Sequence, residues 1–267
     1  MPTTSDSTTS QALSVYLITR NEATHLERVL ERVQGADEIV VVDSGSTDDT
    51  VAIARRHGAR VIHQEWLGYA RQKAFALQQC THLWVLNLDG DEVLPAGALG
   101  LIRDRIDAGD VNGIYLSHDD LFFGETLCGH RHRRFCRVYR KDRASWNTDL
   151  QVHEHIDVEG PTAVLPITVT HYGYDSVHRL GEKINRYSLL KANQRESEGR
   201  GFSSGRLLFI LPVMFLKFYV VRRMFLSGRR GFVKAVVEAF QHFLTEAKLY
   251  ERSFRAERQS GHCNPAK

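Results

Sequence analysis

Short runs of valine, isoleucine and leucine alternate with stretches of helical periodicity over the first hundred residues. The runs are dominated by valine, isoleucine and leucine and do not alternate between apolar and polar residues, which predicts strands buried on both faces. We expect strands at Leu13–Thr19, Glu38–Asp43, Arg60–His63 and Leu83–Asp89, and helices at Glu22–Val33, Asp48–His57 and Gly68–Gln79. This alternation predicts an open, mostly parallel α/β sheet with its ligands at the carboxyl ends of the strands.

The pattern becomes less regular after about Asp110 but still predicts strands and a long helix. We expect a helix beginning at Pro95, strands at Gly113–Ser117, Phe135–Tyr139 and Ala163–His171, and a helix at Ser176–Glu198. These elements are interpreted as the second half of one domain over residues 12–198. Residues 1–11, rich in Ser and Thr, are expected to be a disordered lead-in without a signal peptide.

A glycine-rich break at Gly199–Gly205 precedes an apolar run that Lys217 interrupts. We expect this run to be too short and too charged to span a bilayer, which needs about 20 apolar residues. Apolar residues then recur at helical spacing, so we predict two amphipathic helices separated by Gly228–Gly231. Residues 199–258 are therefore predicted to form a helical extension, and residues 259–267 a flexible tail.

The charge of the chain is concentrated in that extension. The 267 residues have a net charge of +3, and residues 200–258 contain twelve Lys and Arg against four Glu, which is +8 there and −5 elsewhere. The high apolar content favours an anionic membrane surface as the partner, and no nucleic acid is expected. Helices that simply pack as a core are the alternative.

The cysteines stand at irregular intervals without a C-x-x-C pair, which predicts free thiols in a reducing compartment, the cytoplasm. They are Cys80, Cys128, Cys136 and Cys263. Cys128 and Cys136 with His130 and His132 could bind zinc, but their spacing is not a standard structural-zinc pattern.

Acidic residues at strand ends are the candidate chemistry. Asp89 and Asp91, separated by Gly90, follow a buried strand, and such a pair can hold Mg²⁺ or Mn²⁺ together with substrate phosphates. Asp43 ends another strand, beside a small-residue turn that opens a helix. No G-x-G-x-x-G follows the first strand and no P-loop is present, which disfavours dinucleotide oxidoreductases and P-loop enzymes.

Four motifs resemble those of one known family. R-N-E-A follows the first strand, V-V-D-S-G-S-T-D the second and L-D-G-D-E the fourth, with W-x-G-x-x-x-Q-K in the third helix. They are similar to the inverting family 2 glycosyltransferases of the GT-A fold, closely over residues 13–95 and more loosely to about 250. With a later V-H-E, the set resembles bacterial lipopolysaccharide inner-core β-1,4-glucosyltransferases. Gly90 stands where Ala is more usual, and Ala74 where Asn is expected.

This resemblance implies an α/β GT-A fold and a role for each matching residue. Those assigned to the nucleotide-sugar donor are Thr19, Asn21, Glu22, Asp43, Ser46, Lys73, Asp89 and Gly90. Within this set Asp43 would accept a hydrogen bond from the nucleotide base, and Asp89 would contact the ribose. Asp91 would ligate Mg²⁺ or Mn²⁺, with Asp89 and His171 as additional candidates. A histidine satisfied within the fold is the alternative for His171.

An inverting transfer also needs a general base for the acceptor hydroxyl. The resemblance assigns it to Glu154, with Asp149, Asp157 and Glu159 as rivals nearby. An arginine-rich stretch is expected to form a basic acceptor face or an ordinary solvated surface. Its members are Arg131, Arg133, Arg134, Arg137 and Arg140.

We therefore expect an enzyme that moves a hexose, with glucose as the expected sugar, from a nucleotide diphosphate sugar such as UDP-glucose. The expected acceptor is a sugar hydroxyl of a lipid-linked saccharide of the lipopolysaccharide core. The enzyme would be cytoplasmic and peripheral on the inner face of the cytoplasmic membrane. A polyprenyl-phosphate glycosyltransferase and a noncatalytic, membrane-docked sugar-nucleotide binder are the alternatives.

Overall fold

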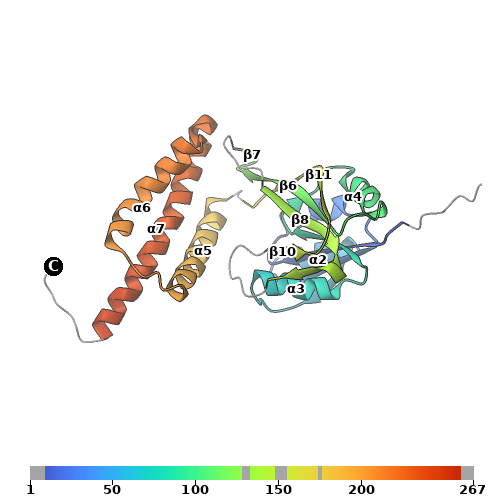
Figure 1. Ribbon diagram of the computed structural model, residues 1–267, viewed down its shortest axis with the longest axis horizontal. Coiled ribbons are helices and arrows are strands. Elements are labelled where there is room, and N and C mark those ends of the chain that lie inside the picture. The colour runs from blue at the N-terminus through green and yellow to red at the C-terminus, as the bar shows by residue number, and fades with distance from the viewer. Residues whose placement is uncertain (1–9, 128–132, 148–154, 174–175, 260–267) are drawn as a thin grey trace, which may run out of the picture. The chain divides into compact units, whose positions relative to one another are not determined.

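The computed structural model describes residues 10–127, 133–147, 155–173 and 176–259. The chain divides into two compact units. The first comprises residues 1–119 and 132–172, and the second comprises residues 120–131 and 173–267. Figure 1 labels several elements of each unit.

The first unit is an α/β fold built on one large mixed sheet. Its strands are β1 (Leu13–Thr19), β2 (Glu38–Asp43), β3 (Arg60–His63), β4 (Trp84–Asp89), β5 (Glu92–Val93), β6 (Gly113–Phe122), β8 (Arg133–Arg140), β9 (Ala144–Trp146), β10 (Ile156–Val158) and β11 (Thr162–His171). Its helices are α1 (Leu26–Arg32), α2 (Thr50–Arg56), α3 (Tyr69–Gln79), α4 (Ala98–Asp107) and the 3₁₀ turn η1 (Lys141–Arg143). The last residues of β6 belong to the second unit.

The strand order of the sheet is β3-β2-β1-β4-β8-β6-β11-β5, and β9 pairs with β10 separately. Strands β3, β2, β1 and β4 are parallel, as the βαβ rhythm of the sequence predicts, and β8 joins β4 antiparallel. The predicted α/β class, with a parallel N-terminal half, is confirmed. All four parallel strands send their carboxyl ends to one edge, where ligands bind in such sheets.

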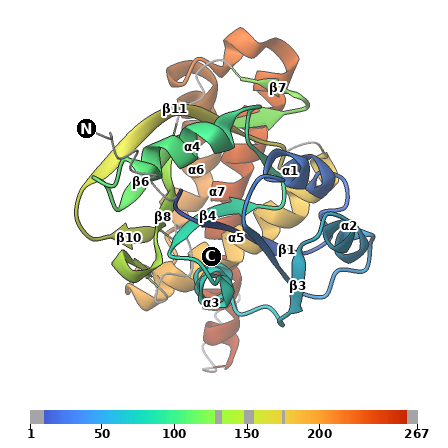
Figure 2. The ribbon, with the colours of Figure 1, turned by 90° about the vertical axis from the view of Figure 1, so that its right-hand side faces the viewer.

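Helices cover both faces of this sheet. Strand β1 is buried along its whole length, as its continuous apolar run predicts. Leu26 of α1, Ile53 of α2 and Ile102 of α4 pack into the core on one face. Ala76 and Leu77 of α3 pack against the other face. Figure 2 shows α3 and α4 on opposite sides of the strands.

Several element boundaries differ from the sequence prediction. Helix α1 begins at Leu26 instead of Glu22, because Asn21 adopts a left-handed backbone conformation (φ +57°) that ends the strand in a turn. Helix α4 begins at Ala98 and not at Pro95, whose carbonyl accepts from the Ala98 amide at 3.2 Å. The short strand β5 was not predicted, since two residues carry no periodic signal.

The second unit is mainly helical. Its elements are β7 (Glu125–Thr126), α5 (Val177–Ser197), α6 (Ser204–Leu216), the π-helical turn η2 (Lys217–Val221), the 3₁₀ turn η3 (Met224–Ser227) and α7 (Gly228–Gln259). The predicted boundary at residue 198 placed α5 with the sheet. In the structure α5 packs with α7, where the buried side chains of Arg195 and Glu246 form an ion pair.

The helical extension differs from its prediction in two respects. Helix α7 starts at Gly228 and runs through the predicted Gly228–Gly231 break, so that η3 makes the turn instead. Gly231 fits there because a Cβ would lie 1.8 Å from the Met224 carbonyl oxygen. Moreover, Ser204–Val221 is one helical stretch of 18 residues, long and apolar enough to cross a membrane by length and composition alone. The expectation that this run is too short is wrong on length, because Lys217 does not interrupt the helix.

Candidate active site

Two turns at the parallel edge of the sheet hold each other in place. The Asn21 amide donates to Ser46 Oγ at 2.9 Å, and Asn21 Oδ1 accepts from the Thr47 amide at 2.8 Å. The Glu22 amide donates to Thr50 Oγ1 at 2.8 Å. The turn after β1 is thus fixed to the turn after β2. This brings together the residues after both strands that are predicted to bind the nucleotide-sugar donor.

Asp43 is the centre of the second turn. Its side chain is buried, and one carboxylate oxygen accepts from the amides of Gly45 and Ser46 at 2.9 and 2.8 Å. Its other oxygen accepts from the hydroxyls of Thr19 and Ser46. Asp43 therefore shapes the turn, whatever contact it makes with a ligand.

Asp89, the last residue of β4, lies beside a buried cation. Lys73 Nζ on α3 lies 2.9 Å from Asp89 Oδ1, and the Arg137 guanidinium lies 3.8 Å from Asp89 Oδ2. Burial alone would raise the pKa of Asp89, but the charges of Lys73 and Arg137 outweigh it and hold this pKa below its usual range. Asp89 is therefore ionised at neutral pH, and Lys73, which the resemblance assigns to the nucleotide-sugar donor, forms an ion pair with it.

Gly90 joins the loop after β4 to the turn after β1. A Cβ on Gly90 would lie 2.9 Å from Glu22 Cγ and 3.3 Å from Thr19 Cγ2. The absence of a side chain lets the two loops approach each other. Thr19, Glu22 and Gly90, which are predicted to bind the nucleotide-sugar donor, are consequently neighbours in space.

Asp91 lies against a histidine from a distant strand. His171 Nε2, at the end of β11, is 3.2 Å from Asp91 Oδ2. The Tyr172 amide also donates to the Asp91 carbonyl at 3.0 Å, which fixes β11 to this loop. The structure thus brings together the predicted metal ligand Asp91 and its additional candidate His171, which are 80 positions apart in the sequence.

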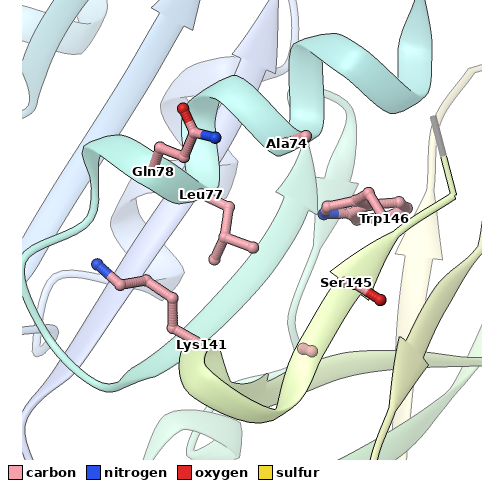
Figure 3. A pocket seen from close by; sticks show the side chains of 7 residues that line it. Ala74, Leu77, Gln78, Lys141, Ser145 and Trp146 are labelled. Atoms are coloured by element: carbon pink, nitrogen blue, oxygen red, sulfur yellow. The ribbon is translucent and has the colours of Figure 1, made fainter.

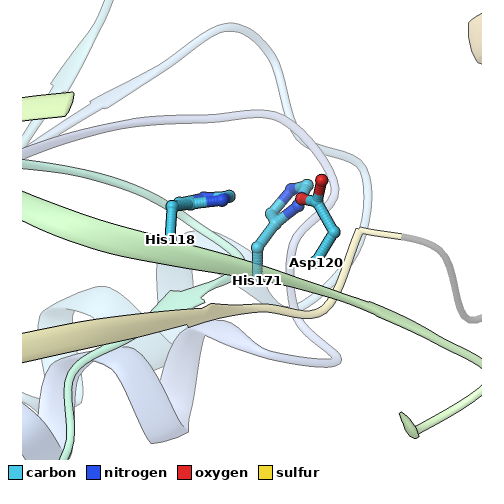
Figure 4. A group of neighbouring side chains, drawn as sticks. All are labelled: His118, Asp120 and His171. Atoms are coloured by element: carbon cyan, nitrogen blue, oxygen red, sulfur yellow. The ribbon is translucent and has the colours of Figure 1, made fainter. Parts of the chain in front are cut away.

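A second imidazole lies beside His171. The rings of His118 on β6 and His171 are 5.1 Å apart between centroids, and both histidines could ligate a metal ion. Figure 4 shows the two rings, together with Asp120 two residues beyond His118 on β6. Asp120 belongs to the second unit, whereas the other residues of the candidate site belong to the first.

A buried ion-pair network that the sequence did not predict lies next to the loop. Glu92 pairs with Arg137 of β8, and its Oε1 lies 2.8 Å from His118 Nε2. Glu92 Oε2 accepts from the Asp89 amide at 3.0 Å, and Arg137 donates to Asn87 Oδ1 at 3.2 Å. This network ties the loop to the neighbouring strands.

Arg137 corrects one expectation. The sequence predicts Arg137 in a basic acceptor face or on a solvated surface, yet its side chain is buried. Burial would lower the pKa of Arg137, but the carboxylates of Glu92 and Asp89 outweigh this and raise it. The sequence marked Glu92 only as the last residue of the L-D-G-D-E motif. It could not predict the ion pair with Arg137, because no local pattern links Glu92 to a strand 45 residues away.

A pocket of about 360 Å³ lies between α3 and β9. Figure 3 shows its lining, with Trp146 on one side and Gln78 and Lys141 on the other. Trp146 donates through Nε1 to the Tyr16 hydroxyl at 3.1 Å, and Lys73 Nζ lies 5.6 Å from the Trp146 ring centre. Lys73 therefore contacts both Asp89 and a wall of this pocket.

Some predicted residues lie outside the described part of the chain. Glu154, the predicted general base, is one of them, as are Cys128, His130 and His132 of the zinc alternative. Cys136 of that alternative is described, and burial raises the pKa of its thiol to about 12. Because zinc binds the thiolate, this burial makes Cys136 a poor ligand.

Comparison with known proteins identifies the family. The model of glycosyl transferase family 2 matches residues 14–161. An uncharacterized glycosyltransferase of Rickettsia conorii is 34% identical, over 92% of this chain and 93% of its own length. The lipopolysaccharide core biosynthesis glycosyltransferase LpsC of Rhizobium meliloti is 33% identical, over 90% of this chain and 92% of its own.

Solved structures are less similar. A glucosyl-3-phosphoglycerate synthase from Mycobacterium tuberculosis, in complex with Mn²⁺, UDP and glucosyl-3-phosphoglycerate, shares 23% identity over 43% of this chain and 45% of its own, with a TM-score of 0.35. The family match covers more than half of the chain, and relatives cover nearly all of it. The chain therefore belongs to glycosyltransferase family 2 and is a glycosyltransferase.

Proposed function

We propose that the protein transfers a hexose, with inversion, from a nucleotide diphosphate sugar to a sugar hydroxyl of a lipid-linked acceptor. The pairing of Asp91 with His171 at the parallel edge of the sheet, next to ionised Asp89, carries this proposal. The relative LpsC, named for lipopolysaccharide core biosynthesis, supports the lipopolysaccharide core as acceptor. UDP-glucose is the donor that we propose to test first.

The residues of this edge fit a divalent cation. A carboxylate and an imidazole are both ligands of Mn²⁺, and Asp91 and His171 are each accessible from solvent, with 17% and 12% of their side-chain surface exposed. Asp91 would hold Mn²⁺ or Mg²⁺, with His171 as a second ligand. The bound ion would neutralise charge on the leaving diphosphate.

The other residues would bind and orient the two substrates. Thr19, Asn21, Glu22, Asp43 and Ser46 would form the nucleotide-binding edge, because their turns are fixed to each other. Lys73, Asp89 and Gly90 would adjoin the ribose and diphosphate. Such positioning supplies a large part of the rate enhancement in transfer reactions.

Glu154 would act as the general base. Its carboxylate would take the proton of the acceptor hydroxyl, whose oxygen then bonds to the anomeric carbon from the side opposite the diphosphate. The bond from the anomeric carbon to the diphosphate breaks in the same step, which inverts the configuration. We propose that this takes place in the cytoplasm, at the inner face of the cytoplasmic membrane.

Asp91→Asn tests the metal step. We expect transfer from UDP-glucose to a lipid-linked core acceptor, measured with Mn²⁺ present, to fall by on the order of 100-fold or more. His171→Ala should raise the Mn²⁺ concentration needed for half-maximal rate. Asp104→Asn, on the exposed face of α4, is the matched control and should leave the rate unchanged. Wild-type turnover by Asp91→Asn at low Mn²⁺ would refute the metal role.

Glu154→Gln tests the acceptor. If the acceptor is a sugar hydroxyl, the rate should fall at least about 100-fold, because the hydroxyl proton then has no base. A polyprenyl phosphate needs no such base, so undiminished transfer to that acceptor would contradict the proposal. The anomeric configuration of the product, read by NMR, checks the inversion.

A further inference from the structure

Helix α6 and the turn after it carry an apolar surface that the protein leaves largely uncovered. Six apolar side chains of Ser204–Val221 are more than half exposed: Leu208 (71%), Phe209 (65%), Val213 (55%), Leu216 (56%), Val220 (51%) and Val221 (76%). Met214 and Phe218 alone among its apolar residues are buried, against Ala235 and Ala239 of α7. A helix that is apolar all round is normally buried in a core or in lipid.

The same surface continues into the turn. Phe225 and Leu226 of η3 are 46% and 59% exposed, and Phe232 at the start of α7 is 48% exposed. Monomeric soluble proteins rarely expose a contiguous apolar surface of this extent without a partner. We therefore expect a partner to cover the α6–η3 segment, which we define as residues 204–227.

The charges on this part of the chain indicate which kind of partner contacts the exposed apolar surface. Residues 199–237 contain eight Lys and Arg and no Asp or Glu. Lys217, Arg222, Arg223 and Arg229 are exposed, and none of them forms an ion pair with another described residue. Apolar side chains bordered by cations alone match the acyl chains and headgroups of an anionic lipid leaflet. A second copy of this segment would bring like charges together.

The contact of α6 with helix α7 disfavours an arrangement in which α6 spans the bilayer. Helix α7 packs along α6 in a hairpin (Figure 1), so any bilayer that α6 crossed would also contain the first half of α7. That half carries Lys234 and Glu238, whose Nζ and Oε1 are 2.8 Å apart. Each charge at the bilayer centre costs about 2.5–3.5 kcal/mol or more. Crossing is therefore disfavoured even though α6 is long enough.

We propose that the α6–η3 segment lies lengthwise within one leaflet of an anionic membrane. Its apolar side chains enter the acyl region, and Lys217, Arg222 and Arg223 meet the headgroups. Arg229, at the start of α7, also meets the headgroups, and the rest of α7 stays on the aqueous side. This deepens the proposed function, since it rests on a lipid-linked acceptor. Its test measures binding and not transfer, so the two proposals can fail separately.

Vesicle flotation of the full chain tests the binding. We expect strong binding to vesicles of phosphatidylcholine with phosphatidylglycerol and weak binding to pure phosphatidylcholine. Leu208→Glu with Phe209→Glu should weaken binding at least about 100-fold, because two exposed apolar side chains no longer enter lipid. Leu101→Glu with Val164→Glu, at residues 52% and 50% exposed in the first unit, is the matched control and should bind like the wild type.

Arg222→Gln with Arg223→Gln tests the headgroup contact. Binding to the anionic vesicles should weaken about 30-fold, with little change on neutral ones. Equal wild-type binding to both vesicle types, or full binding by the Leu208 and Phe209 variant, would overturn the proposal. So would concentration-dependent dimerisation without vesicle binding.

A label in the turn tests the depth. Ser227→Cys, in a background with serine at positions 128 and 263, is labelled with the fluorophore NBD and bound to preformed vesicles. Dithionite added outside should bleach the fluorophore, because the turn stays on the side of addition. Protection from dithionite would mean that the helix crosses the bilayer, and would overturn the one-leaflet arrangement.

Discussion

Gly90 shows how one residue sets the distance between two loops of the candidate site. The turn after β1 and the loop after β4 approach so closely that a Cβ at position 90 has no room between Glu22 and Thr19. The sequence resemblance marked Gly90 as a departure from the more usual Ala. The structure gives a reason for it, because the side chain of Glu22 occupies the space that a methyl group would need.

Gly90→Ala should therefore destabilise the protein by about 1–3 kcal/mol, the usual cost of overpacking. Combining it with Glu22→Ala, which removes the Cγ at 2.9 Å, should cost less than the sum of the single changes. Chemical denaturation of the four proteins measures this coupling. Strict additivity would show that the two loops do not constrain each other.

Arg137 and Glu92 form the buried pair behind the same loop. Arg137→Met leaves the Glu92 carboxylate buried without its cation, and should lower the free energy of unfolding by about 3–5 kcal/mol. Arg137→Met together with Glu92→Leu should recover part of this loss, because neither charge is then left alone. If the free energy of unfolding that the double variant loses equals the sum of the losses in Arg137→Met and Glu92→Leu, the two residues are not coupled.

At the scale of elements, Glu38 ties four segments together at the start of β2. Its carboxylate accepts from Ser14 Oγ of β1 at 2.6 Å, Arg60 Nη2 of β3 at 2.7 Å, and the Thr81 amide before β4 at 2.7 Å. Burial would raise the pKa of Glu38, but these hydrogen bonds outweigh it and lower the pKa to about 2. The parallel strands are thus aligned at the end opposite the candidate site.

The lowered pKa of Glu38 predicts that the free energy of unfolding depends on pH. Glu38 binds a proton near pH 4.5 in the unfolded chain and near pH 2 in the folded one, so its contribution is complete above pH 4.5 and is lost as the pH falls toward 2. Glu38→Gln should cost about 1–3 kcal/mol at neutral pH, and the cost should shrink over that window. Urea denaturation at a series of pH values checks it, and a cost independent of pH would contradict it.

At the scale of the whole molecule, the two units have separate cores. The sheet unit is organised around β1 and β4, whereas the helical unit packs Met214, Phe218 and Met224 of the hairpin against Ala235 and Ala239 of α7. Separate cores allow the units to open with different free energies.

Ala239→Asp tests this separation. A buried carboxylate in the helical core should lower hydrogen-exchange protection of α5, α6 and α7 by at least about tenfold, because burying a polar group unpaired costs about 1–3 kcal/mol or more. Amides of β1 and β4 should keep their protection. Val236→Asp, at a residue 39% exposed on the same helix, is the control. Equal loss of protection in both units would show a single cooperative unit.

Local pattern determined much of this protein. Continuous apolar runs predicted β1 to β4 almost to the residue, because strands buried on both faces need such runs. The motifs at the strand ends gave the family and the candidate residues Asp43, Asp89 and Asp91, since parallel strands bring their carboxyl ends to one edge.

Only the tertiary structure decided which distant residues meet. The pairing of His171 with Asp91 and of Arg137 with Glu92 depends on β11 and β8 joining the sheet, and no local periodicity encodes that choice. The exposure of the apolar side chains of α6 likewise depends on the tertiary structure, because a hydrophobic run has the same sequence pattern in a core and on a surface.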